Sequence, residues 1–313
     1  MKPFHRLSFV RLSTPTLLIC SSMMSGLAEA DPIPDESKTV IPKATLDRLD
    51  QQLDVTFANY GERTLQMDIF RPKEESQALP AIVCIHGGGW QKGSKINHRK
   101  VAQALAAEGY VTASIDYRLS GEARFPAHIH DCKAAVRFLR ANAEKYGINA
   151  DRIGAIGHSA GGHLAALLAT SSGVAELEGD GGNAGVSSAL QAVVPMGGQT
   201  DFMSARNREK SATAEIWQKF LGGSQEELPA TYRLASPLEH LDESDPPVWI
   251  ITGEKDDSST HAEALRKKMD EFEIENGLTI INGAPHPFTV RQVWFDQMME
   301  IAVPFFDRTL KKD

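Results

Sequence analysis

The chain reads Ile-Gly-Ala-Ile-Gly-His-Ser-Ala-Gly-Gly-His over residues 153–163, and this stretch decides the fold. A short apolar run leads into a Gly-x-Ser-x-Gly pattern, and the helix-forming run 164–169 follows directly. The pattern predicts a strand, a sharp turn and a helix, with Ser159 at the apex of the turn. Glycine is needed at positions 157 and 161 because the serine backbone is strained and the helix must pack close to the strand.

A second glycine-rich stretch precedes the serine. Residues 81–90 read Ala-Ile-Val-Cys-Ile-His-Gly-Gly-Gly-Trp, so another apolar strand ends in consecutive glycines. Such a loop can aim bare amide N–H groups into a cavity, where they would stabilise the oxyanion of an acyl-transfer reaction. We expect Gly87 or Gly88 to supply one donor and the amide of Ala160 another. We expect His86 to hold the loop in shape rather than to act as a base.

With these two motifs the chain resembles α/β-hydrolase carboxylesterases that carry a His-Gly-Gly-Gly oxyanion loop, a group related to the hormone-sensitive-lipase-type esterases. It is more similar still to bacterial acetylxylan and feruloyl esterases, over about residues 50–310. Further matching stretches are Asp-Tyr-Arg-Leu at 116–119, Phe-Pro-Ala at 125–127 and Ala-Ser-Pro at 235–237. The resemblance implies a serine esterase that deacylates plant polysaccharides. The alternatives are a general small-ester carboxylesterase or a serine peptidase of the same fold, whose relatives usually lack the triple glycine.

A serine nucleophile needs a base, and in this fold the chain order is serine, then carboxylate, then histidine. We predict His286 as the general base and acid, because it lies in a loop directly after the strand-like run 278–281. Similar esterases read Gly-x-x-His-x-Phe here, which fits Gly283, His286 and Phe288. We expect the remaining histidines after the serine to pack in the core or to lie on the surface: His163, His240 and His261.

The orienting carboxylate is predicted to be Asp256. A buried strand at 247–252 precedes it, and the family pattern Gly-x-x-Asp falls on this residue. Relatives usually continue with a Val-Pro pair, whereas this chain continues with Asp257 and Ser-Ser-Thr. This departure leaves Asp257 as an alternative, and Asp201, after another apolar strand, as a third candidate. Each of these aspartates could instead form an Asx turn or cap a helix.

Strand and helix patterns alternate along the rest of the chain. Apolar strands separated by amphipathic helices predict an α/β-hydrolase fold, with a mostly parallel central sheet of about eight strands and helices on both faces. The first two strands suit an antiparallel hairpin at one edge. Strands are predicted at 52–59, 64–70, 81–85, 110–115, 152–156, 190–196, 247–252 and 278–282. Helices are predicted at 98–108, 127–145, 159–170, 210–221, 261–274 and 290–309.

The pocket rim and the domain limits follow from the same patterns. Loops 171–189 and 200–245 are expected to form the rim of the pocket, and the width of the pocket is expected to depend on these loops and on loop 120–126. Trp90, beside the glycine loop, is expected to contact an aromatic acyl group or to pack. Residues 31–50 are predicted to be an N-terminal lead segment, loose over 31–43, before an α/β-hydrolase domain at 51–313.

Residues 1–30 have the pattern of a signal peptide. A basic start is followed by a mostly apolar stretch at 16–27, and Ala-Glu-Ala at 28–30 matches a cleavage site. The apolar stretch is short for a membrane span. We therefore expect export, to the periplasm or the medium, after cleavage near Ala30, and no membrane attachment afterwards.

The net charge of the chain indicates which classes of binding partner are compatible with it. The formal net charge is −8, and removal of residues 1–30, which carry three basic residues and one acidic residue, makes it −10. An acidic exterior argues against nucleic acid or anionic membranes and is compatible with a small ester or a neutral esterified polysaccharide. We expect Cys84 and Cys132 to be buried free thiols. No cofactor or metal is implied, and the oligomeric state is not indicated.

Overall fold

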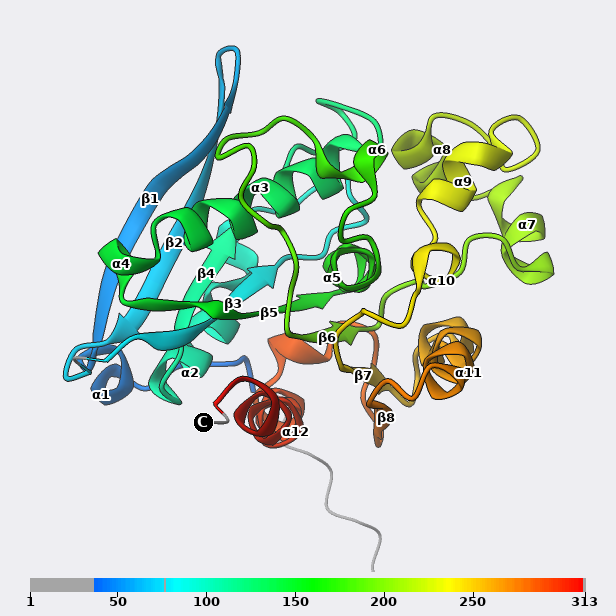
Figure 1. Cartoon of the computed structure of the whole chain (residues 1–313). Coiled ribbons are helices and arrows are strands. Elements are labelled where there is room, and N and C mark those ends of the chain that lie inside the picture. The colour runs from blue at the N-terminus through cyan, green and yellow to red at the C-terminus, as the bar shows by residue number, and fades with distance from the viewer. Residues whose placement is uncertain (1–36, 76, 312–313) are drawn as a thin grey trace, which may run out of the picture. The chain divides into compact units, whose positions relative to one another are not determined.

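The computed structural model describes residues 37–75 and 77–311 (Figure 1). The predicted signal peptide, 1–30, and the first residues of the lead segment, 31–36, lie outside the described residues. Within the described ranges, no helix combines the length and the apolar character needed to cross a membrane.

A single eight-stranded sheet forms the framework, in the order β1-β2-β4-β3-β5-β6-β7-β8. Strands β1 and β2 form an antiparallel hairpin at one edge, β2 also pairs antiparallel with β4, and every other pair is parallel. This is the predicted architecture. The strands are β1 (Leu49–Tyr60), β2 (Arg63–Pro72), β3 (Leu79–Ile85), β4 (Val111–Ile115), β5 (Ile148–His158), β6 (Ala192–Met196), β7 (Val248–Gly253) and β8 (Asn276–Ile281).

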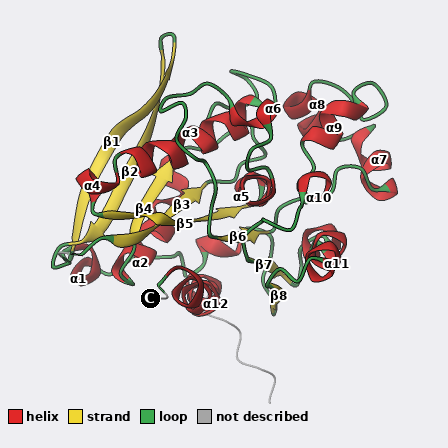
Figure 2. Ribbon diagram, viewed as in Figure 1, coloured by secondary structure: helices red, strands yellow, loops and turns green. Residues whose placement is uncertain are grey.

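Helices cover both faces of the sheet, which explains why its central strands are apolar throughout (Figure 2). On β3, Ile82 packs with helices α2 (Arg99–Ala107) and α12 (Gln292–Leu310). Its neighbour Val83 points to the opposite core, with α3 (Ala127–Ala141), α5 (Ala160–Thr170) and α11 (Glu263–Glu271). Because successive side chains alternate across a strand, a strand with no exposed residue requires a covered face on each side.

The remaining helices are short. They are α1 (Lys43–Leu46), α4 (Ala143–Tyr146), α6 (Ala175–Glu178), α7 (Ala205–Ser211), α8 (Glu215–Leu221), α9 (Pro229–Leu234), α10 (Pro237–His240) and the 3₁₀ turns η1 (Lys95–His98), η2 (Ser258–His261) and η3 (Phe288–Val290). Several of them lie between β6 and β7, in the stretch from residue 200 to 245 (Figure 1).

The prediction of one helix at 210–221 is wrong. The structure has α7 and α8 with a break between them, where Ala214 leaves the helical conformation. The Ser211 hydroxyl donates back to the carbonyl of Arg208 at 2.7 Å, a bond that competes with helix continuation. The Gln218 amide then donates to the carbonyls of Ser211 and Ala212 at the end of α7.

The described part of the lead segment differs from the loose chain that we expected. The amide of Thr39 donates to Val290 O at 3.1 Å, and the amide of Val40 donates to Gln292 Oε1 at 2.8 Å. The backbones of Lys38 and Arg291 also form an isolated antiparallel β-bridge. Residues 38–40 therefore lie along the segment that follows β8.

Both cysteines are free and buried, Cys84 on β3 and Cys132 on α3. Burial raises the pKa of each thiol above its usual value, which keeps both protonated at neutral pH.

Candidate active site

Ser159 lies at a sharp turn between β5 and α5, with φ 58° and ψ −117°. A positive φ is rare for a residue with a side chain, and this one is held by glycine packing on both sides. A Cβ on Gly157 would lie 2.2 Å from the carbonyl oxygen of Gly161. A Cβ on Gly161 would lie 2.1 Å from the carbonyl oxygen of Ile85. The two glycines let α5 approach β5 and β3 closely, as predicted.

The structure brings the three predicted site residues together. The Ser159 Oγ and His286 Nε2 atoms are 2.7 Å apart, and His286 Nδ1 lies 2.8 Å from Asp256 Oδ2. The second carboxylate oxygen of Asp256 accepts the amide of Asp257 at 2.8 Å. The Asp256 side chain is only 6% exposed, whereas that of His286 is 43% exposed. A buried carboxylate, an imidazole and a partly buried serine hydroxyl are thus linked in one hydrogen-bonded chain.

The two other aspartate candidates contact different groups. Asp257 accepts the amide of Ser259 at 2.9 Å and the guanidinium of Arg206 at 2.8 Å. Asp201 accepts the amides of Met203 and Ser204, at 2.7 and 3.1 Å, in an Asx turn. Neither carboxylate is hydrogen-bonded to His286 in the described structure.

Glycine also permits the close approach of the loop after β3 to Ser159. A Cβ on Gly87 would lie 2.7 Å from the carbonyl oxygen of His158 and 3.1 Å from Ser159 Cβ. Gly88 has φ +125°, and a Cβ there would lie 2.0 Å from the carbonyl oxygen of Lys92. Within the described ranges, the amides of Gly87, Gly88 and Ala160 donate to no protein acceptor. They are therefore available to an oxygen atom bound beside Ser159.

His86 supports this loop from below. Its Nδ1 donates to Gly87 O at 2.8 Å, and its ring stacks on Tyr117 with 4.2 Å between the centroids. Tyr117 also donates its hydroxyl to the carbonyl oxygen of His86 at 3.0 Å. Burial lowers the pKa of His86 to about 4, so the ring is neutral at pH 7. These contacts give His86 the loop-holding position that we expected.

His158 is a site residue that the sequence analysis missed. Its Nε2 donates to the backbone carbonyl of His286 at 2.7 Å, and the two rings lie 5.0 Å apart. Burial, with the nearby His286 as a smaller cause, lowers the pKa of His158 to about 4. The neutral ring fixes the backbone of the loop that carries His286. The only sequence signal was its place inside the Gly-x-Ser-x-Gly pattern.

Trp90 and His163 are packing residues. The Trp90 indole donates to His163 Nδ1 at 3.2 Å and stacks on Phe220 with 4.3 Å between the centroids. His163 in turn donates from Nε2 to the carbonyl of Ala235 at 2.8 Å. Trp90 is 5% exposed, so of the two roles considered for it the structure favours packing.

A cleft of about 640 Å³ lies over Ser159 and His286. The glycine loop and residues 92–98 form one wall of the cleft, and residues 287–290 form the other. Ile216 on α8, in the segment between β6 and β7, also lines the cleft. The predicted rim is therefore wrong for loop 171–189, which contributes no described residue to this cleft. Loop 120–126, on which the width of the pocket was expected to depend, contributes none either.

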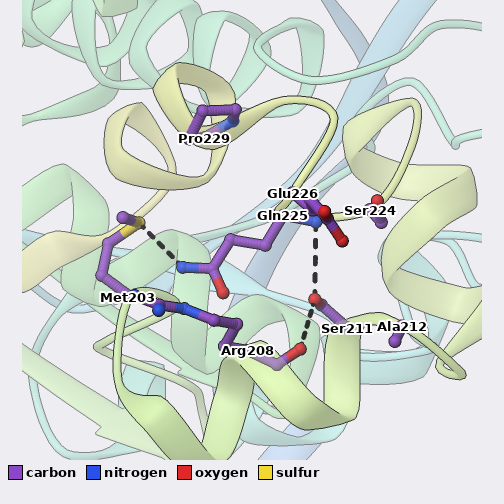
Figure 3. A pocket seen from close by; sticks show the side chains of 8 residues that line it. All are labelled: Met203, Arg208, Ser211, Ala212, Ser224, Gln225, Glu226 and Pro229. Carbon is purple, nitrogen blue, oxygen red and sulfur yellow. Dashed lines mark hydrogen bonds between the residues drawn. The ribbon is translucent and has the colours of Figure 1, made fainter.

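Much of the segment between β6 and β7 encloses a different pocket, of about 460 Å³ (Figure 3). There Gln225 donates its side-chain amide to Met203 Sδ at 3.3 Å, and the Gln225 backbone amide donates to Ser211 Oγ at 3.4 Å. Ser159 and His286 do not line this pocket. Ile216 is the one described residue of the segment that lines the cleft over Ser159.

The geometry around Ser159 suits acyl transfer. His286 can take the hydroxyl proton as Oγ attacks a carbonyl carbon, and a buried aspartate on Nδ1 favours the protonated ring that results. Free amides beside the serine can stabilise the charge on the carbonyl oxygen. Within the described ranges, no group of three or more His, Cys, Asp or Glu side chains is placed to hold a metal ion.

Comparisons with known proteins agree with this geometry. The chain is 31% identical to the esterase LipC of Mycobacterium tuberculosis over 201 residues, which is 63% of this chain and 50% of LipC. This chain spans about half the length of LipC and of two further mycobacterial relatives.

Two solved structures are similar over most of this chain. A truncated carbohydrate esterase from gut microbiota is 27% identical with a TM-score of 0.72, covering 90% of this chain and 99% of that one. A bifunctional GH43-CE protein of Bacteroides eggerthii is 28% identical with a TM-score of 0.73, covering 83% of this chain and 35% of that one. The BD-FAE family pattern matches residues 67–269. The chain therefore has the α/β-hydrolase fold of these esterases and belongs to the BD-FAE family.

Proposed function

We propose that this protein is a carboxylic ester hydrolase in which Ser159 is the nucleophile, His286 the general base and acid, and Asp256 the orienting carboxylate. The observation that carries the proposal is the unbroken hydrogen-bonded chain from Ser159 Oγ through His286 to Asp256, at 2.7 and 2.8 Å. The named esterases among its relatives support the same reaction class.

The reaction proceeds in two halves. His286 removes the proton of Ser159 as Oγ attacks the ester carbonyl, and the amide of Ala160 with that of Gly87 or Gly88 stabilises the oxyanion. His286 then protonates the alcohol, which leaves, and the acyl group remains on the serine. Water, deprotonated by His286, attacks this acyl-enzyme and releases the acid. Asp256 keeps the imidazole in the tautomer that both halves need.

We further propose that the natural substrates are acetyl or feruloyl esters on plant polysaccharides. Support comes from the BD-FAE family match and from the carbohydrate esterase of gut microbiota with a similar structure. The size of the cleft, about 640 Å³, is adequate for an acyl group together with part of a sugar. The signal-peptide pattern at residues 1–30 would place the enzyme outside the cytoplasm, where such polymers occur.

The first experiment incubates the full chain with acetylated, feruloylated arabinoxylan and quantifies free acetate and ferulate. The Ser159→Ala variant is the matched blank, and aryl esters of increasing chain length are run in parallel. We expect release by the wild type alone, with the acetate-to-ferulate ratio defining the acyl preference. Hydrolysis by Ser159→Ala would refute the assigned nucleophile. Hydrolysis of aryl esters without release from arabinoxylan would indicate a general small-ester hydrolase.

A further inference from the structure

The cleft over Ser159 continues into a second hollow. This hollow has a volume of about 320 Å³ and shares three lining residues with the cleft: Asn97, Thr289 and Val290. Beyond them it is lined by residues 38–39 of the pinned lead segment and by the start of α2. We call the cleft and this hollow together the extended groove. It leads from the proposed nucleophile to a surface that the sequence analysis did not connect with the site.

The position of His286 determines which part of an ester lies in the extended groove. A base that protonates the leaving alcohol must lie on the alcohol's side of the carbonyl. Residues 287–291 follow His286 directly and form one wall of the groove. The hollow therefore continues from the side on which the alcohol leaves, so it receives the alcohol portion of the substrate, while the acyl group stays in the cleft beside Ser159.

The charge of the extended groove differs from that of the whole chain. The chain as a whole carries a formal charge of −8. Among the described residues, however, no Asp or Glu lines the groove, and four cationic residues do: Lys38, Lys92, Lys100 and Arg291. In the part of the chain that the structure describes, the ammonium groups of Lys38 and Lys92 have no ion-pair partner. Lys100 donates to the carbonyl of Thr39, which holds its ammonium at the groove.

The wall that carries Lys92 and Lys100 is fixed by a buried ion pair. Lys95, in the turn η1, lies 2.7 Å from Asp68 on β2 and 2.6 Å from Asp54 on β1. The carboxylate of Asp68 is fully buried and also accepts Arg99 at 2.6 Å. Breaking such a buried pair is costly, so η1 has a fixed position relative to the sheet. Lys92 and Lys100 flank this turn, and the groove is therefore built in advance of binding.

Apolar side chains lie between the charges. Ile96 is 62% exposed and Val290 is 53% exposed, which is unusual for residues of this size, and both line the hollow with Val101. A sugar ring offers apolar C–H faces to such side chains and hydroxyl groups to Asn97 and Thr289. Cations beside apolar patches match a chain of sugars of which some carry carboxylates.

We propose that the extended groove binds the alcohol portion of an acidic substrate, namely an acylated polysaccharide bearing uronic acid residues. The inference rests on the proposed ester hydrolysis and sharpens its substrate class. It also departs from the neutral polysaccharide that the acidic net charge favours, because a local groove and not the mean charge meets the substrate.

The experiment compares two pools of oligosaccharides from one acetylated glucuronoxylan, separated by anion exchange into uronate-bearing and neutral chains of equal length. Acetate release gives kcat/KM for each pool, and Ser159→Ala is titrated with both pools to measure binding without turnover. We expect the uronate-bearing pool to be preferred by about threefold to tenfold, since exposed charge pairs are individually weak. The preference should fall at about 0.5 M salt.

Variants of the lysines test whether the preference for uronate-bearing chains arises in the extended groove. Lys38→Gln and Lys92→Gln, singly and together, should lower the ratio of uronate-bearing to neutral kcat/KM, and Lys92→Glu should lower it further. Lys145→Gln, on α4 and outside both hollows, is the control and should leave the ratio unchanged.

The outcomes separate the inference from the function on which it rests. Equal turnover and equal binding of the two pools would overturn the uronate proposal and leave the esterase intact. Hydrolysis of aryl acetates but of neither pool would overturn it as well. Absence of any ester hydrolysis would overturn the proposed function, and in that case unequal binding by Ser159→Ala would still support an acidic ligand in the groove.

Discussion

The turn at Ser159 and the segment between β6 and β7 hold their residues in opposite ways. At the turn, backbone packs on backbone, and every residue of α5 is buried. The segment between β6 and β7 consists of short helices joined by side-chain hydrogen bonds, and it contacts the Asp257 loop through the side chains of Arg206 and Gln199. The proposed chemistry is thus fixed by contacts that admit no side chain, and the surroundings by contacts that can be exchanged.

The largest expected effect separates two neighbouring aspartates of the loop after β7, of which Asp256 contacts His286 and Asp257 contacts Arg206 of the segment between β6 and β7. Asp256→Asn should lower kcat by about 10⁴-fold with little change in KM, because the amide supports the wrong imidazole tautomer. Asp257→Asn removes only the exposed contact to Arg206 and should change kcat by less than about fivefold. Steady-state kinetics with an aryl acetate measure both, with circular dichroism as the check of folding. Similar losses in the two variants would refute the choice of Asp256.

Two glycine substitutions test the contrast in packing directly. Gly161→Ala places a Cβ 2.1 Å from the carbonyl oxygen of Ile85, so we expect unfolding to become easier by about 3 kcal/mol or more. Gly121, in a surface loop, has nothing within 4 Å of such a Cβ. Gly121→Ala should change stability by less than about 1 kcal/mol. Urea denaturation gives both values, and equal values would show that the turn tolerates displacement.

Acid should lower the free energy of unfolding, because several buried histidines are neutral in the folded protein. Burial lowers the pKa of five histidines, to about 4 for His86, His158 and His163 and to about 3 for His98 and His128. A histidine with a depressed folded-state pKa stabilises the protein fully above the unfolded value near 6.5 and loses this contribution as the pH falls toward the folded value. Between about pH 6 and pH 4.5 the free energy of unfolding should fall by up to about 1.4 kcal/mol per pH unit for each histidine.

Denaturant titrations at a series of pH values measure this slope. His163→Gln should reduce it, because this variant removes one of the rings whose pKa burial lowers. Asp245, whose burial raises its pKa to about 7, acts with the opposite sign and loses stabilisation as the pH rises through neutrality. Maximum stability is therefore expected near neutral pH. A flat profile from pH 7 to pH 5 would contradict the burial of the neutral rings.

The smallest effect concerns the one residue that the segment between β6 and β7 contributes to the cleft. Ile216 on α8 is 41% exposed, and its side chain lies against Gly89 of the glycine loop. Ile216→Ala should change the ratio of kcat/KM for butyrate and acetate aryl esters by about twofold to tenfold, as one or two methylene contacts do. Lys219→Gln, on the same helix and exposed, is the control. An unchanged ratio would place the acyl group elsewhere.

The parts of the site that the sequence predicted are those with local causes. The glycines around Ser159 meet steric demands that arise within a few residues, so the sequence could predict the strand, the turn and the helix. Asp256 and His286 were predicted from the order of triad residues in this fold, from their places just after strands and from the resemblance to esterases that read Gly-x-x-Asp and Gly-x-x-His-x-Phe there. Their loops could be assigned because β7 and β8 are short apolar runs with clear ends.

The parts that the sequence did not predict depend on contacts between distant residues. The break after α7 depends on Gln218 capping Ser211, and no helix-period pattern records such a bond. The sequence analysis missed the cleft walls at 92–98 and 287–290. The position of η1, in the first of these walls, depends on the ion pair between Lys95 and Asp68 on β2, which is distant in the sequence. His158 was missed because its partner is a backbone carbonyl of the His286 loop, 128 residues further along the chain.

The segment between β6 and β7 leaves the sheet and returns to it at adjacent parallel strands. Its ends are therefore held close together by the sheet itself, and its length and sequence can change without disturbing the order of the strands or the turn at Ser159. Sequence changes can therefore accumulate in this segment independently of the turn at Ser159. A relative with the same strands and a different insertion would keep the turn at Ser159 and lose only the contact that Ile216 makes with the cleft.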